Sequence, residues 1–509
     1  MNPILLTALL PAAGALLMLL PPLRRVALQL LLLIAVATFG VSIGLTVVTP
    51  ATAVIYFGLG FGENYFVFDA TAQLFTSLIN LVFLGVAAYM LTHARPDGHR
   101  GFGHRFAGYA LGFMAAANLA VLSNHLLMAW AFVEATTLFA VPLIAHDRTG
   151  EAWRASWRYL LLSTVGLSLT FLGFVCLERS VEITSQHEGL SFFLDQFDLA
   201  SRDSQNFAHK LGILLILFGY GTKLGLAPMY SWLPDTYDTA RPPVTTLLAA
   251  VQFNIAFVAL FRVLQTFGAS DQELIRGVLT AMGLASMVVS AINIVATRNY
   301  KRIIAFASIN HAGAIALGLG VGGSAIYGAL LYAVSNALIK AVLFLTAGEI
   351  EEHFGTKRTD EVDGLLTEMP FSGIFLMFGT FALLGFAPFG SFVGELVMMG
   401  GMIEAGQTIL FSALCLILLI VFVATGRSMF PMIWATPARP RPPRVRRRPR
   451  AQGPVPAAAF HPRHLHADAP QRPAAPGRSQ PRRPAMTTRS RPPPRLASAL
   501  SAHSPGGLP

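Results

Sequence analysis

Apolar runs of 18 or more residues recur along the chain and are separated by short polar links. A run of this length, folded as an α-helix, crosses the roughly 30 Å hydrocarbon core of a bilayer. The pattern therefore predicts an all-α polytopic membrane protein with about 13 transmembrane helices, which we number spans 1 to 13. The predicted spans are 3–21, 26–48, 68–93, 106–123, 125–145, 158–178, 209–229, 244–266, 274–296, 302–322, 326–347, 370–394 and 407–426.

The links between the spans alternate in charge. The basic links after spans 1, 3, 5 and 9 contain Arg24-Arg25, HARPDGHRGFGHR, HDRTGEAWRASWR and TRNYKR. The links after spans 2, 6 and 8 contain GENYFVFD, the acidic segment 178–208 and ASDQE. Because basic links stay on the cytoplasmic side, we expect the N-terminus outside a bacterial inner membrane and the C-terminal tail in the cytoplasm.

The composition is that of a membrane protein without a cofactor motif. The chain has 509 residues, of which 54% are hydrophobic and 12% charged, whereas soluble domains carry about 25% charged residues. Cys176 and Cys415 both lie inside apolar runs, and the chain contains no CxxC, GxGxxG or P-loop motif. Such motifs form redox or metal sites and bind nucleotides. We therefore expect no cofactor, no metal site and no redox centre in this chain.

The tail from Pro437 to Pro509 differs from the rest of the chain. It contains 15 Arg, no Lys, 18 Pro and one acidic residue, so its charge of +14 exceeds the +11 of the whole chain. A segment so poor in aliphatic residues does not bury enough apolar surface to fold. We expect either disorder or a translated out-of-frame 3′ end. The arginines suit anionic membrane lipid, and we expect no specific nucleic-acid partner.

Two short stretches repeat each other at a distance of 160 residues. Residues 225–235 read GLAPMYSWLPD and residues 385–395 read GFAPFGSFVGE, at the ends of spans 7 and 12. An odd and an even span cross in opposite directions, so the repeat is inverted, a pattern typical of transport sites built on broken helices. We therefore predict that spans 7 and 12 are discontinuous. The residues at the predicted breaks are Gly225, Pro228, Gly385 and Pro388.

Five ionisable residues lie within or next to predicted spans. A charge at a helix centre costs about 2.5–3.5 kcal/mol on insertion scales, so these residues are expected to face the protein interior, where they are paired or hydrated. Carboxylate, ammonium and imidazole groups all exchange protons, which indicates a proton pathway. The alternative is a set of ion pairs that only hold helices together, and the small number of carboxylates argues against a sodium site. The five residues are Glu134, Lys223, His311, Lys340 and Glu395.

Five motifs resemble the proton-translocating membrane subunits shared by respiratory complex I (its L, M and N subunits), Mrp-type cation/proton antiporters and membrane-bound hydrogenases. The likeness is strongest to the F component of hydrogenase-4, and it covers roughly residues 60–430 with the motifs in the family's order. The motifs read FVEATTL, GYGTKLGLAPMYSWLPD, NYKRIIAFASINHAGAIALGLG, ALIKAVLFLTAG and GFAPFGSFVGEL.

The resemblance implies a role for each ionisable residue. Glu134 corresponds to the glutamate of the family's fifth helix, and Lys223 to the lysine of the broken seventh helix that pairs with it. His311 corresponds to a relay position in mid-membrane. Lys340 corresponds to the lysine of the eleventh helix, and Glu395 to the terminal ionisable residue of the broken twelfth. Where the family's eleventh helix reads LNHxLxK, this chain reads VSNALIK.

These observations predict three regions and a function. Residues 1–105 form N-terminal membrane helices, residues 106–430 form a proton-translocating core with inverted repeats, and residues 437–509 form the tail. We expect a proton-translocating subunit of a redox-driven complex, of the hydrogenase-4/formate hydrogenlyase or NADH:quinone oxidoreductase type, with other membrane and peripheral subunits as partners. One alternative is an Mrp-type cation/proton antiporter or ion-uptake subunit without a redox partner, and another is a free-standing secondary transporter. Oxidoreductase activity would belong to the complex, and whether the chain itself counts as an enzyme is open.

Overall fold

The computed structural model describes residues 3–20, 26–58, 63–93, 102–184, 191–194 and 206–435. The chain divides into one unit from Met1 to Pro440 and a second from Arg441 to Pro509. All of the described residues belong to the first unit. The tail predicted at 437–509 lies outside them.

The described chain is almost entirely helical, because a helix satisfies its backbone hydrogen bonds within one segment and an apolar environment supplies no other partner. The 3₁₀ helices are η1 (Pro3–Leu5), η3 (Ala145–Asp147), η5 (Ala269–Asp271) and η6 (Thr359–Glu361), and η4 (Leu247–Gln252) is a π-helical segment. The α-helices are α1 (Leu6–Leu17), α2 (Ala27–Val48), α3 (Ala70–Thr92), α4 (His104–Leu122), α5 (Leu126–Ile144), α6 (Gly150–Thr184), α7 (Phe207–Leu224), α8 (Trp232–Thr239), α9 (Pro242–Thr246), α10 (Phe253–Gln265), α11 (Gln272–Ala296), α12 (Tyr300–Val321), α13 (Ser324–Phe354), α14 (Leu365–Glu368), α15 (Pro370–Leu383), α16 (Gly390–Glu404) and α17 (Thr408–Trp434).

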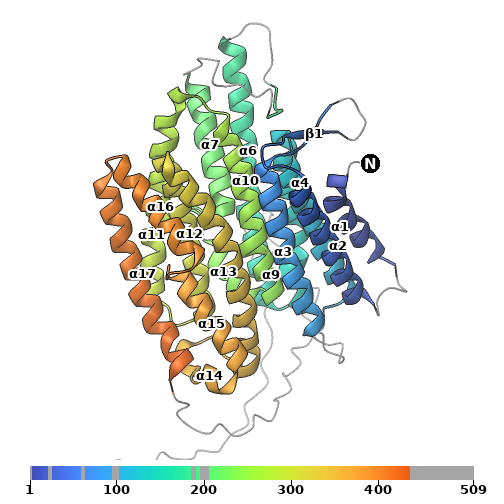
Figure 1. Ribbon diagram of the computed structural model, residues 1–509, viewed down its shortest axis with the longest axis vertical. Helices are drawn as coiled ribbons and strands as arrows, with labels where there is room; N and C mark the ends of the chain where they lie inside the picture. Colours follow the sequence, from blue (N-terminus) through green and yellow to red (C-terminus); the bar gives the residue numbers. More distant parts are fainter. Residues whose placement is uncertain are drawn as a thin grey trace, which may run out of the picture. The chain divides into compact units, whose positions relative to one another are not determined.

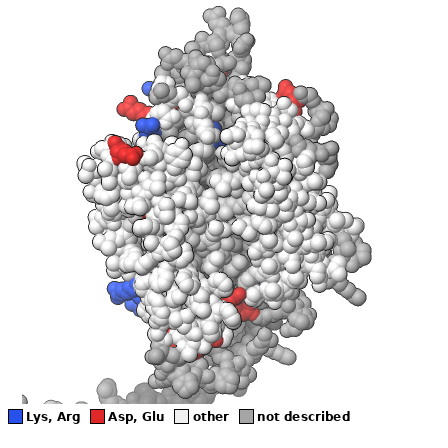
Figure 2. Space-filling view, in the orientation of Figure 1, with Lys and Arg blue, Asp and Glu red and all other residues white. Residues whose placement is uncertain are grey.

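Ten helical segments in the described part of the chain are long and apolar enough to cross a membrane. Helix α1 and the broken pairs α7–α8 and α15–α16 occupy the places of the other predicted spans, and the total of thirteen stays a prediction. On the face shown in Figure 2, charged side chains lie near the two ends, and a broad uncharged band separates them. Such a band suits the hydrocarbon core. The predicted class, a polytopic helical membrane protein, is confirmed.

Helix α12 lies in the interior of the helix bundle. It packs along α11 and α13, and almost all of its residues are buried. In Figure 1, α1 and α2 lie at one edge of the bundle and α17 at the opposite edge. Helices α2 and α17 expose large apolar side chains along much of their length, as lipid-facing helices do. The polar residues in the middle of α12, which are Ser308, Asn310 and His311, are therefore shielded from lipid by other helices.

The first predicted break follows α7. Gly225 has a φ of 77°, a left-handed conformation that glycine adopts without the steric cost of a Cβ atom. The Gly225 N–H donates to the Thr222 carbonyl (3.2 Å), and the Leu226 N–H donates to the Gly221 carbonyl (2.8 Å). These two bonds form the Schellman motif that ends many helices. A non-helical link follows before α8 begins.

The second predicted break has the same backbone arrangement. Gly385 has a φ of 69°, and its N–H donates to the Ala382 carbonyl (3.3 Å). The Phe386 N–H donates to the Phe381 carbonyl (3.1 Å). Each of these four residues follows its counterpart in the first break by 160 positions. The two predicted discontinuous helices are thus confirmed, with Pro228 and Pro388 in the links, each preceded by a cis peptide bond.

Side chains add hydrogen bonds to backbone groups at the two breaks. The Thr222 carbonyl accepts from Trp232 Nε1 (2.9 Å), and its counterpart, the Ala382 carbonyl, accepts from Ser391 Oγ (2.6 Å). In the first link, the Ala227 N–H donates to Ser286 Oγ on α11 (2.8 Å). Unpaired backbone groups are expensive in an apolar interior, and these contacts together with the Schellman bonds stabilise the two helix ends.

One feature departs from the predicted all-α fold. Strands β1 (Ile55–Phe57) and β2 (Phe66–Phe68) pair antiparallel between α2 and α3. The rings of Phe57 and Phe66 stack with centroids 5.6 Å apart. β-Branched and aromatic residues favour paired strands, so this link forms a short hairpin.

Candidate functional site

Lys223 lies in the last turn of α7, directly before the first break, and is only 2% exposed. Its Nζ donates to Thr137 Oγ1 (2.5 Å) and to the Tyr159 hydroxyl (3.3 Å). The same Nζ lies 4.9 Å from the centre of the Tyr159 ring. A buried ammonium needs acceptors for its three N–H groups. Two hydroxyls and one aromatic face provide this environment, and no carboxylate among the described residues contacts the ammonium directly.

Glu134 reaches Lys223 through Thr137. Its Oε1 accepts from Thr164 Oγ1 (2.8 Å), and its Oε2 accepts from Thr137 Oγ1 (3.4 Å). Glu134 and Thr137 are three residues apart on α5 and therefore share one helix face. The two ionisable residues that the sequence pairs are thus brought together, and in the described part of the chain a hydroxyl group separates them.

Neutral polar groups extend this first cluster. Gln252 Oε1 accepts from Thr136 Oγ1 (2.9 Å) and from the Tyr159 hydroxyl (3.4 Å). Gln252 is the last residue of the π-helical segment η4 and is fully buried; π-helical turns are frequent at functional sites. The first cluster therefore consists of Glu134, Thr136, Thr137, Tyr159, Thr164, Lys223 and Gln252.

A second cluster forms along one face of α13. Tyr332, Asn336 and Lys340 follow one another at intervals of four residues, so their side chains lie on the same side of the helix. All three are at most 2% exposed. Each makes a hydrogen bond to a different neighbour, and two of these neighbours, His311 and Glu395, are ionisable residues that the sequence singled out.

His311 links α12 to the second break. Its Nε2 lies 3.2 Å from the Leu383 carbonyl, at the end of α15, and its Nδ1 lies 2.8 Å from Asn336 Oδ1. The last carbonyls of a helix have no intrahelical partner, which leaves the Leu383 oxygen free to accept. The imidazole ring also meets the Tyr332 ring edge to face, with centroids 5.0 Å apart.

Glu395 lies in α16, and its carboxylate reaches the second break. Its Oε1 accepts from the Tyr332 hydroxyl (3.0 Å). The carboxylate stands directly over Gly385, where a Cβ atom would collide with Glu395 Oε2. The second cluster therefore runs from His311 through Tyr332 to Glu395, and Asn336 holds the other side of the imidazole.

Lys340 shares the α13 face with Tyr332 and Asn336, but among the described residues it makes no hydrogen bond to a member of either cluster. Its Nζ donates to the Ile304 carbonyl (3.3 Å), its one hydrogen bond in the described part of the chain. A series of aromatic rings connects the first cluster to the neighbourhood of Lys340. Adjacent rings in this series have centroids 5.2 to 6.0 Å apart, and its members are Tyr159, Trp232, Tyr237 and Phe344. Phe344 is one helical turn from Lys340, so packed rings occupy this interval.

Charged residues hold α8 at one end of the bundle. Asp235 pairs with Arg158 and with Arg302, the latter at 2.6 Å. Asp238 pairs with Arg302 (3.2 Å) and Lys357 (3.2 Å). Asp235 is the repeat counterpart of Glu395, yet it lies in a network of arginines. The two related carboxylates therefore have different surroundings.

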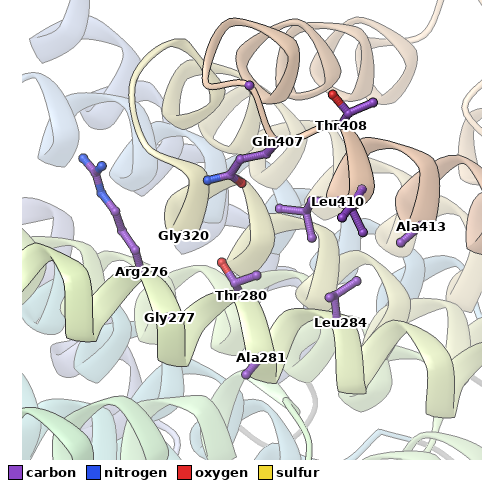
Figure 3. A pocket seen from close by; sticks show the side chains of 12 residues that line it. Arg276, Gly277, Thr280, Ala281, Leu284, Gly320, Gln407, Thr408, Leu410 and Ala413 are labelled. Atoms are coloured by element: carbon purple, nitrogen blue, oxygen red, sulfur yellow. The ribbon is translucent and has the colours of Figure 1, made fainter.

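The clusters lie apart from a pocket at another place in the bundle. Within the described ranges, no group of three or more His, Cys, Asp or Glu residues is placed to hold a metal ion. A pocket of about 880 Å³ lies between α11 and the start of α17 (Figure 3) and contains none of the five predicted residues. Its polar lining residues are Arg276, Thr280, Gln407 and Thr408.

Several residues of the clusters could not be singled out from the sequence. Thr137 and Tyr159 are neutral, and hydroxyl residues are common in membrane helices. Their spacing from an ionisable residue could have indicated them, because Thr137 follows Glu134 by three residues and Tyr332 precedes Lys340 by about two helical turns. The sequence carried no comparable signal for Gln252.

Known proteins resemble this chain over most of its length. Residues 123–420 match the family described as "NADH:quinone oxidoreductase/Mrp antiporter, TM". The chain is 30% identical to "Hydrogenase-4 component F homolog" of Methylacidiphilum infernorum, over 66% of this chain and 72% of the relative. It is also 30% identical to "NADH-quinone oxidoreductase subunit N" of Desulforudis audaxviator, over 73% and 74%. With "Na(+)/H(+) antiporter subunit A1" of Staphylococcus saprophyticus it shares 27% identity, over 65% and 42%.

Solved structures show the same fold. A chain of the Mrp complex from Dietzia sp. superposes with a TM-score of 0.77 at 20% identity, over 86% of this chain and 81% of that one. A chain of respiratory complex I from Thermus thermophilus superposes with a TM-score of 0.72 at 22% identity, over 85% and 89%. The chain belongs to the NADH:quinone oxidoreductase/Mrp antiporter family of proton-translocating, antiporter-like membrane subunits.

Proposed function

We propose that this chain conducts protons through its two clusters, as the proton-translocating subunit of a membrane-bound redox complex of the hydrogenase-4 type. The observation that carries the proposal is the contact series Lys223–Thr137–Glu134 beside a helix break. A buried ammonium and a carboxylate that both contact one hydroxyl form a path for a proton. The proton passes from one group to the next, and neither side chain has to move.

The first transfer runs through the Thr137 hydroxyl. Lys223 Nζ gives a proton to Thr137 Oγ1, and Thr137 gives its own proton to Glu134 Oε2, so that an N–H bond is exchanged for an O–H bond on the carboxylate. The products are a neutral amine and a neutral acid. Both are less costly than charges in an apolar interior, so the transfer discharges the cluster.

The second cluster would form the other end of the proposed proton pathway. Tyr332 donates to Glu395, and the His311 ring contacts both Tyr332 and the free carbonyl at the end of α15. A proton that arrives at His311 is one phenol ring from the Glu395 carboxylate. The interval between the clusters passes Lys340 and the aromatic series, and water that enters this interval would carry the proton across it.

The proposed complex type rests on the relatives. The hydrogenase-4 relative matches 72% of its own length at 30% identity, so we expect membrane and peripheral redox subunits as partners. The alternative, a cation/proton antiporter subunit, is favoured by the antiporter relatives and by the Mrp fold neighbour. On either assignment, we expect the N-terminus outside the inner membrane and the tail in the cytoplasm.

Two measurements test the proposal. The epitope-tagged chain, purified from native membranes, should bring with it a nickel–iron hydrogenase large subunit or a quinone-linked iron–sulfur subunit. Recovery with cation-antiporter subunits alone would exclude the redox assignment. Inverted vesicles that contain the assembled complex should acidify when its electron donor is added. If neither a donor nor a cation gradient moves protons in these vesicles, proton conduction is wrong.

A further inference from the structure

We propose that the Asn336 side-chain amide rotates each time His311 gains or loses a proton, which makes Asn336 the positioning residue that lets the ring work in both states. The inference rests on the proposed function only in supposing that His311 changes its protonation state. It follows from two hydrogen bonds on the two nitrogens of one buried ring.

The first bond determines which tautomer is present. His311 Nε2 faces the Leu383 carbonyl at 3.2 Å. A carbonyl oxygen only accepts hydrogen bonds, so Nε2 must carry a hydrogen whether the ring is neutral or charged. In the neutral ring, Nδ1 is then the unprotonated nitrogen.

The second bond must therefore reverse its direction. In neutral His311, Nδ1 accepts, so Asn336 must present its NH₂ group. In charged His311, Nδ1 donates, so Asn336 must present its oxygen, the arrangement seen at 2.8 Å. Oxygen and NH₂ have nearly the same size, and half a turn about the last side-chain torsion exchanges them. The described residues show no second hydrogen bond to Asn336 that would oppose this turn.

Ionisable groups near the ring come from two other helices. Lys340 and Tyr332 face it from α13, and Glu395 contacts Tyr332 from α16. Helix α15 presents only the Leu383 carbonyl to the ring. Helix α11 carries no charged residue over 277–296, α17 carries only Arg427, and the aspartates of α8 are held by arginine and lysine. A neutral amide at position 336 adds no charge to this setting, so it follows the ring without favouring one state.

An Asn336→Asp substitution tests the inference, because a carboxylate accepts but does not donate. Nitrogen NMR of histidine-labelled complex, with the His311 signal assigned by its loss in His311→Gln, gives the titration midpoint of the ring. We expect Asn336→Asp to raise this midpoint by about one to three pH units and to reduce proton flux. Asn254→Asp, the same change at another buried amide, should leave the midpoint unchanged. Asn336→Leu, which offers neither a hydrogen-bond donor nor an acceptor, should reduce proton flux without raising the titration midpoint of the ring.

The outcomes separate this inference from the proposed function. If Asn336→Asp leaves the midpoint unchanged, or if Asn254→Asp shifts it equally, Asn336 does not govern the ring and the inference is wrong. If the midpoint shifts as expected but His311→Gln leaves proton flux unchanged, the amide rotation is supported. The proposal that His311 is part of the proton pathway is then wrong. Size-exclusion profiles of the purified complexes verify that each variant assembles.

Discussion

The Glu395 carboxylate rests on Gly385, at the point where α15 stops and the link to α16 begins. An ionisable residue of the proposed pathway thus depends on the absence of a side chain at the break. The same glycine also adopts a left-handed backbone conformation. One residue therefore serves both the end of the helix and the placement of the carboxylate.

Gly385→Ala should move Glu395 away from Tyr332. The added Cβ would collide with the carboxylate, and the left-handed conformation would cost about 1–2 kcal/mol. Gly225→Ala is the matched control, because Gly225 has a similar φ but faces the flexible end of Leu233. We expect similar losses of melting temperature in both variants. The infrared carboxyl band of Glu395, assigned with Glu395→Gln, should shift in Gly385→Ala alone, and an equal shift in both would contradict the argument.

Thr137→Val should interrupt the contact between Lys223 and Glu134. The valine keeps the shape of the side chain but leaves the ammonium one acceptor short, at a cost of about 1–3 kcal/mol in stability. Proton flux in inverted vesicles should fall at least about tenfold. Thr137→Ser retains the hydroxyl and should keep most of the flux. Equal activity of the Val and Ser variants would show that the hydroxyl carries no proton.

Glu134→Gln should lower proton translocation and leave assembly intact. The amide has nearly the volume of the carboxylate and can still accept from Thr164, but it does not take up a proton at Oε2. The measurement compares initial acidification rates with the amount of complex recovered from the membrane. Loss of the complex from the membrane, rather than loss of flux, would indicate that Glu134 is a structural ion-pair partner.

Asp238→Asn should loosen the attachment of α8. Asp238 is 16% exposed and accepts from Arg302 and Lys357, so the loss of its charge should cost about 1–3 kcal/mol. Asp360→Asn offers a control at an exposed pair with Arg358, where surface charges contribute little. Thermal unfolding of the purified complex should show a lower midpoint for Asp238→Asn only. A similar midpoint for the two variants would mean that the α8 network is not stabilising.

The helix breaks and the ionisable residues inside the spans could be identified from the sequence, because residues of both kinds are normally excluded from membrane helices. Glycine and proline inside an apolar run, and a lysine before them, are costly unless the structure accommodates them. The Thr137 hydroxyl between Lys223 and Glu134 could not be foreseen. Threonine carries no comparable penalty in a helix, and the contact depends on how α5 and α7 are rotated relative to each other.

The other unforeseen features depend on local backbone detail. The π-helical segment places Gln252 toward Tyr159, and a helix period read from the sequence does not predict such a turn. The β-hairpin consists of two three-residue strands, which are too short for a periodic pattern. Tyr332 belongs to the second cluster because α13 packs against α16, and the sequence does not predict this packing.

The rings of Trp232, Tyr237 and Phe344 have a consequence for a cell at rest. They fill the interval between the first cluster and Lys340 with packed aromatic side chains, and a proton does not cross such packing without water. If the proposed function is right, these packed rings block proton transfer between the two clusters for as long as no water enters between them. A complex without an electron donor would then not let protons flow back through it. The membrane would keep its proton gradient for the other proteins that this gradient drives.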